Sequence, residues 1–211
     1  MKFFIVLFVL LCGCATDVAK VPNKVDLSLQ GIKYYDDADV VLSDVAEAVT
    51  PVSMPGDEPR VLMVPFAVRQ DVGVRREIGQ EMGDIFYRTW LGEQVFGVME
   101  YDTSRRWTGV KDALAYAKAK GANTLLIGNI SHFMEGGGTG RTSIGLTVQL
   151  YWVPTGTLIW SAAQAGQMES APNRDYVVVR TTRRLPEYPS YAVMQAISLN
   201  LAQAYVSHSE D

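Results

Sequence analysis

Few residues in this sequence have the type and spacing that catalysis or phosphate binding requires. The glycine-rich segment 135–142 departs from a phosphate-binding loop, because Glu135 replaces its first glycine, Arg141 replaces its lysine, and a strand pattern follows. His132 and His208 are isolated, and no serine lies in a Gly-x-Ser-x-Gly pattern. Two cysteines and two histidines are too few for a multi-cysteine zinc site. The sequence therefore predicts no catalytic residue, no metal site and no cofactor.

One cysteine has a clear chemical role, because it follows a secretory segment. Lys2 precedes the apolar run 3–11, which is too short to span a bilayer and is typical of a signal peptide. The next residues, 11–14, have the sequence LCGC and resemble a bacterial lipobox, in which the last cysteine is acylated. We therefore predict a lipoprotein signal peptide at 1–13 and a lipid on Cys14. The alternatives are a signal peptide without lipidation and a buried N-terminal anchor.

The candidate partner-binding residues are one tryptophan and a group of arginines. Trp107 follows Arg105 and Arg106 before an expected helix, whereas the other three tryptophans lie in apolar patterns of expected helices and strands. The late polar segment is basic within an acidic protein, since it contains Arg174, Arg180, Arg183 and Arg184. Such a segment is suited to an acidic protein surface, to lipid headgroups or to a polyanionic polysaccharide. A merely solvated loop is the alternative.

Composition excludes two classes of protein. The 211 residues are 48% hydrophobic and 20% charged, which is typical of a folded chain rather than a disordered one. The net charge is −4, with 19 basic and 23 acidic residues, and the basic residues form no long run. Nucleic acid is therefore not an expected partner.

The chain divides into a leader, a tether and one domain. Residues 14–24 carry the lipid and form a small polar tether, 25–59 form an N-terminal extension, 60–207 form the domain, and 208–211 form a tail. Within the extension, 26–32 alternates like a strand and 42–50 has the composition of a short helix.

The domain alternates strands and helices. Strands are expected at 61–66, 95–101 and 123–130, and helices at about 76–90 and 110–120. The segment 142–153 alternates strictly, which predicts an antiparallel strand with one buried face, and a turn at 154–157 leads to its hairpin partner at 158–161. The rest of 166–188 is a polar loop with one β segment at 176–180, and a helix spans about 191–205. This order predicts the α/β class, with helices on a single mixed sheet.

These segments, in this order, resemble a family of envelope lipoproteins. The strand VLMVPF at 61–66, the segment GANTLLIGNI at 121–130 and the hairpin VQLYWVPTGTLIWS at 148–161 are similar to the periplasmic domain shared by CsgG, PelC, LpoB and the N-terminal domain of TolB. The resemblance covers about 60–206. It implies a TolB N-terminal-like, anticodon-binding-domain-like fold.

The resemblance also implies a function. Members of the family are non-enzymatic accessories or scaffolds that export polysaccharide or protein, or that activate cell-wall synthases, and some assemble into rings. The long membrane hairpins of the curli pore are missing, because the late loop is short and basic. In such lipoproteins an aspartate directly after the acylated cysteine signals retention in the inner membrane, and position 15 here is alanine. The expected location is therefore the outer membrane, with the domain facing the periplasm. Expected partners are envelope proteins, further copies of the chain, and polysaccharide or peptidoglycan.

Two other function classes stay open. One is a lipid-anchored hydrolase in which His132 acts as a base toward a serine distant in sequence. The other is a glycan-binding module that uses Trp107.

Overall fold

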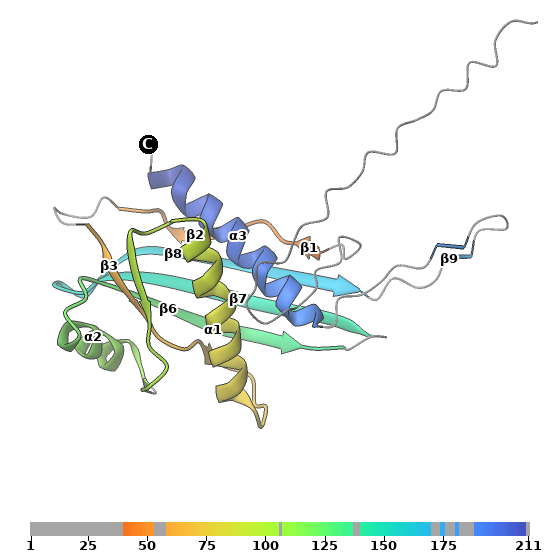
Figure 1. The fold of residues 1–211 in the computed structure, drawn as a ribbon, viewed down its shortest axis with the longest axis horizontal. Helices are drawn as coiled ribbons and strands as arrows, with labels where there is room; N and C mark the ends of the chain where they lie inside the picture. The colour runs from red at the N-terminus through yellow and green to blue at the C-terminus, as the bar shows by residue number, and fades with distance from the viewer. Residues whose placement is uncertain are drawn as a thin grey trace, which may run out of the picture.

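A mixed β-sheet forms the centre of the molecule, with helices on both of its faces (Figure 1). The computed structural model describes residues 40–52, 58–105, 107–136, 140–169, 174–175, 180–181 and 188–209. The strands of the main sheet are β1 (Val40–Leu42), β2 (Ala46–Val49), β3 (Arg60–Met63), β4 (Ala67–Val68), β5 (Val98–Tyr101), β6 (Thr124–Met134), β7 (Arg141–Trp152) and β8 (Thr157–Glu169). The helices are α1 (Arg75–Gly92), α2 (Val110–Ala119) and α3 (Pro189–Ser209). The α/β class and the single mixed sheet are confirmed.

The order of the strands explains where the helices lie. The sheet runs β1-β8-β7-β6-β3-β5, with β2 also paired to β8 and β4 also paired to β6. Strands β5, β3 and β6 are parallel, and β6, β7 and β8 are antiparallel. The crossover through α1 leads from β3 outward to β5, and the crossover through α2 leads back past β3 to β6. Because such crossovers keep one hand, the two helices lie on opposite faces.

The buried core consists of two clusters, one on each face of the sheet. On strand β3, Val61 and Met63 pack under α1 and α3, whereas Leu62 packs under α2. Helices α1 and α3 meet through Trp90, which is fully buried and whose indole N–H donates to the carbonyl oxygen of Ser198 at 3.0 Å. The alternating side chains of β7 behave as the sequence predicts, since residues 144, 146, 148 and 150 are buried.

Two close approaches depend on glycine. A Cβ at Gly79 would lie 2.1 Å from the carbonyl oxygen of Phe66, and one at Gly128 would lie 2.3 Å from its ring. The backbone also joins these segments, because the Phe66 N–H donates to the carbonyl oxygen of Gly79. Helix α1 therefore lies directly against the chain that leaves β3.

Several local predictions hold. Helix α2 ends at Ala119 with Lys120 as its C-cap, Gly121 follows at a φ of +75°, and the turn before β8 places Gly156 at +71°. Pro65 lies two residues after Met63, the last residue of β3. The connection 135–140 joins the antiparallel strands β6 and β7, as expected for a strand connection rather than a phosphate loop.

The ends of the domain differ from the sequence prediction. The short helix expected at 42–50 is wrong, because β1 and β2 pair with β8 there and extend the sheet into the expected N-terminal extension. The hairpin partner expected at 158–161 continues to Glu169, so residues 166–169 are strand rather than loop. Two short strands, β9 (Arg174–Asp175) and β10 (Arg180–Thr181), pair with each other, and residues 26–32 lie outside the described residues. Helix α3 reaches Ser209, within the expected tail.

Candidate functional site

A pocket lies where the parallel strands β3 and β5 end and α1 begins. Parallel strands end at the same edge of a sheet, and the crevice outside their carboxyl ends is where α/β folds bind ligands. The pocket encloses about 150 Å³. Its lining, called the arginine pocket below, consists of Pro65, Phe66, Ala67, Val68, Arg75, Arg76, Gln80, Thr103, Arg105 and Trp107. Three of these residues are cationic and none is acidic.

Trp107 is one wall of the arginine pocket. Its indole N–H donates to the carbonyl oxygen of Pro65 at 2.7 Å, so the ring is fixed to the chain that leaves β3. It also packs against the smaller core cluster beneath α2 and is only partly exposed. The structure thus places the tryptophan singled out from the sequence in a pocket rather than on an open loop.

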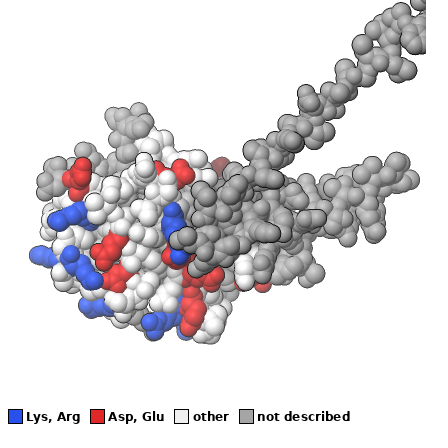
Figure 2. Space-filling model, in the orientation of Figure 1, with Lys and Arg blue, Asp and Glu red and all other residues white. Residues whose placement is uncertain are grey.

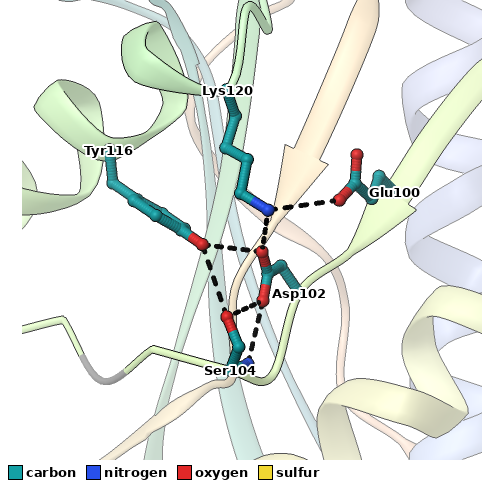
Figure 3. Close-up of polar contacts among 5 residues, drawn as sticks. All are labelled: Glu100, Asp102, Ser104, Tyr116 and Lys120. Carbon is teal, nitrogen blue, oxygen red and sulfur yellow. Dashed lines mark hydrogen bonds and ion pairs between the residues drawn. The ribbon is translucent and has the colours of Figure 1, made fainter.

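A carboxylate network holds the loop that carries this wall (Figure 3). Asp102, 8% exposed, follows β5. Its Oδ1 accepts from the Ser104 backbone N–H at 2.8 Å and from the Ser104 hydroxyl at 2.6 Å. Its Oδ2 accepts from the Tyr116 hydroxyl at 2.7 Å and pairs with Lys120 Nζ at 2.7 Å. Both oxygens therefore have two partners each.

The protonation of this network follows from its contacts. Hydrogen bonds from Lys120, Ser104 and Tyr116 hold the pKa of Asp102 well below its usual value, so the carboxylate is ionised. The same bond to Asp102 raises the pKa of Lys120. Glu100 Oε1 lies 3.9 Å from Lys120 Nζ on the exposed side of the network. Since Asp102 and Lys120 pair with each other, we assign the network the role of positioning the loop rather than that of a free acid or base.

A second carboxylate fixes Arg105. Asp112, in the first turn of α2, accepts from Arg105 Nη2 at 2.6 Å and from the Thr108 backbone N–H at 3.0 Å. The Arg105 guanidinium lies 5.0 Å from the centre of the Tyr116 ring, which adds a cation–π contact. The chain from Asp102 to α2 is thus held at several points, although Arg106 lies outside the described residues.

The other predicted site residues lie elsewhere. Arg174 and Arg180 belong to β9 and β10, where only the backbone is described, while Arg183, Arg184 and Cys14 lie outside the described residues. None of these predictions is therefore tested by the geometry.

The hydrolase alternative rests on one contact. His132 Nε2, on an exposed position of β6, lies 2.8 Å from Ser143 Oγ, on a half-buried position of the neighbouring strand β7. Among the described residues, no carboxylate pairs with the second ring nitrogen of His132. Nor does any group of three or more His, Cys, Asp or Glu within the described ranges form a site for a metal ion.

Sequence reasoning missed most of the arginine pocket. Arg75, Arg76 and Gln80 look like ordinary polar positions of an amphipathic helix, and Asp102 looks like a loop residue. The available signal was their position in a β-α-β unit, since Asp102 directly follows β5 and the other three lie in the first turns of α1, the helix between β3 and β5. None of the described helices has the length and hydropathy of a membrane span.

Comparison with known proteins identifies the fold. No family model and no curated protein matches the chain. The PelC dodecamer from Paraburkholderia phytofirmans superposes with a TM-score of 0.54 at 17% identity, covering 78% of this chain and 97% of that chain. A single-residue variant of that PelC gives 0.52 at 16% identity, covering 77% and 98%. The chain has the fold of PelC.

A third similarity is weaker. The C-terminal domain of LpoB from Salmonella enterica gives a TM-score of 0.33 at 17% identity, covering 53% of this chain and 84% of that chain. This score is too low to support an inference. The resemblance found in the sequence is therefore confirmed at the level of the fold that the chain shares with PelC.

Proposed function

We propose that this chain is a non-enzymatic accessory or scaffold of envelope export or assembly that binds partner proteins and further copies of itself. The observation that carries the proposal is the PelC fold, shared over almost the whole of a protein whose crystals contain a dodecamer. The lipobox sequence adds the location: a lipid on Cys14 would hold the domain at the outer membrane, facing the periplasm.

The uncovered part of the sheet supports self-association. Helix α2 packs over the β3 and β6 end of its face, against Leu62, Val64, Leu125 and Ile127. Further along this face, β7 presents Ser143, Gly145, Thr147 and Gln149, which are half-buried and uncharged. Depletion of charge is typical of the central part of protein interfaces.

The surface around α1 and α2 has a different character. On the view in Figure 2, acidic and basic side chains are interspersed and form no single-sign patch. Charged, mixed surfaces of this kind remain solvated in most proteins. The neutral face of β7 is therefore the better candidate for contact with another copy.

Analytical ultracentrifugation of the purified protein tests self-association. We expect an oligomer that Thr147→Glu dissociates, because a charge would be placed in the middle of the neutral face. Gln203→Glu is the matched control, since it adds the same charge at an exposed position of α3 and should leave the oligomer unchanged. A monomer at all concentrations in detergent and in vesicles would contradict the proposal.

The anchor has a separate test. Mass spectrometry of the mature protein should find an acylated N-terminal cysteine at position 14. Cys14→Ala should move the protein from the membrane fraction to the soluble periplasmic fraction.

A second candidate, the lipid-anchored hydrolase, is favoured only by the contact of His132 with Ser143. Triads orient the histidine with a third group, and the described residues supply none here. The accessory function therefore accounts better for the described structure.

A further inference from the structure

The lining of the arginine pocket has a charge opposite to that of the protein. The chain carries a net charge of −4, yet the lining contains three arginines and no carboxylate. The acids that pair with two of them, Asp71 and Asp112, are not part of the lining. Converging cations in a concave site concentrate negative ligands.

Arg76 and the start of α1 are available to a ligand. Among the described residues, Arg76 makes no ion pair, and its side chain is exposed at the pocket. The first helical hydrogen bond is donated by Ile78 to Val74, and Val74 provides no side-chain cap. The amides that precede Ile78 therefore add donors and the positive end of the helix dipole to the same place.

The other two arginines differ in how firmly they are held. Arg75 pairs with Asp71 at 3.0 Å, but the Asp71 side chain is 94% exposed, so this pair costs little to break. Arg105 is fixed by Asp112 and by the Tyr116 ring. A guanidinium has five N–H donors, so Arg105 keeps donors for a ligand while its position is set in advance.

The volume of the arginine pocket and its indole wall limit the chemical class of ligand that fits. A cavity of about 150 Å³ is the size that holds benzene, so the pocket encloses only part of one sugar unit and the remainder of the ligand would lie in solvent. Trp107 provides an aromatic wall against which the C–H groups of a sugar ring pack, while Gln80 and Thr103 add neutral hydrogen-bonding groups. Guanidinium groups match carboxylate and phosphate oxygens in pairs.

We propose that the arginine pocket binds an anionic sugar unit, with a carboxylate or phosphate on the arginines and the ring against Trp107. This inference goes beyond the proposed function and does not depend on self-association. The ligand enters at the carboxyl ends of β3 and β5, away from the neutral face of β7.

Titration of the isotope-labelled protein tests the proposal, with the NMR signal of the Trp107 indole N–H as the readout. The probes are glucuronate, glucose 6-phosphate and neutral glucose. We expect saturable shifts with both anions, with a Kd of about 1 mM, and none with glucose. Arg76→Gln should weaken binding about tenfold, which corresponds to the loss of one charge-assisted hydrogen bond. Arg88→Gln makes the same charge change at an exposed position near the other end of α1 and should have no effect.

The outcomes separate this proposal from its rivals. Equal weakening by Arg76→Gln and Arg88→Gln would show general electrostatic attraction and overturn the site. Equal binding of glucose, or no saturation by either anion at about 50 mM, would overturn it as well. Sedimentation of the same samples keeps the two proposals distinguishable, because Arg76→Gln should retain the association state of the unmodified protein.

Discussion

Replacing Asp102 by asparagine tests whether the buried carboxylate holds the loop beside the arginine pocket. Asparagine can keep its oxygen toward Ser104, but its amide would then place a donor opposite Lys120 Nζ and the Tyr116 hydroxyl. A hydrogen bond to a charged group contributes about 1.5–3 kcal/mol. Because the Lys120 side chain is 41% exposed, solvent screens part of this, and we expect a loss of about 2 kcal/mol at pH 7.

The pH dependence of the effect follows from the pKa of Asp102. Hydrogen bonds, first of all from Lys120, lower this pKa in the folded protein, whereas the unfolded chain takes up the proton near the ordinary value of 3.8. Asp102 therefore contributes fully above about pH 5, and its contribution decreases as the pH falls toward the folded pKa. The asparagine of Asp102→Asn does not titrate, so the difference in free energy of unfolding between this variant and the unmodified protein should shrink as the pH falls from about 5 to about 2.

Thermal unfolding monitored by tryptophan fluorescence measures both effects. A loss of about 2 kcal/mol corresponds to a Tm lower by about 4–8 °C for a domain of this size. The matched control is Asp84→Asn, since Asp84 pairs with Arg88 on α1 and the two side chains are 41% and 45% exposed. It should change stability by less than about 0.5 kcal/mol. An equal Tm for the two variants, or a pH-independent effect of Asp102→Asn, would refute the reasoning.

Three further changes test packing, ionisation and the hydrolase alternative. Gly79→Ala would place a Cβ 2.1 Å from the Phe66 carbonyl oxygen, so urea unfolding should show a loss of about 1–3 kcal/mol. Gly92→Ala meets no atom within 4 Å in the same helix and should be neutral or stabilising; equal effects would contradict the steric argument. Burial raises the pKa of Tyr205 to about 12, so stability should fall as the pH rises above about 10, where the unfolded tyrosine ionises, and Tyr205→Phe should flatten this alkaline decrease. His132→Ala should leave self-association and export or assembly intact in cells, and loss of function by a normally folded variant would favour the hydrolase.

The central strands were predictable because their signals are local. Residues 142–152 alternate between apolar and polar side chains, and one period-2 pattern fits only a strand with one buried face. The helix beginning near Arg75 and the turn at Gly156 are equally local, since each depends on residues within a few positions. Elements of this kind also contain the segments whose sequences resemble the family that includes PelC.

The sheet edge beyond β7 was not predictable in the same way. Ala46–Val49 contains alanine and glutamate, which favour helix locally, yet it forms β2 because β8 offers an unpaired edge. The later part of β8 is rich in small and polar residues and lacks β-branched ones. It is a strand because β7 pairs with it on one side and β1 on the other. Pairing partners distant in sequence decided both segments.

The arginine pocket shows the same limit at the level of function. Trp107 was predicted from the sequence and Arg105 lies two residues before it, whereas Arg76 lies at the start of α1 and is separated from them by the rest of that helix and by β5. Only the parallel register, which places Met63 beside Tyr101, brings the residues after the two strands to one edge. A slip of β5 by one residue against β3 would turn every β5 side chain to the opposite face and dismantle the pocket. All sequence motifs would remain intact after such a slip, so the site is specified by strand pairing rather than by a motif.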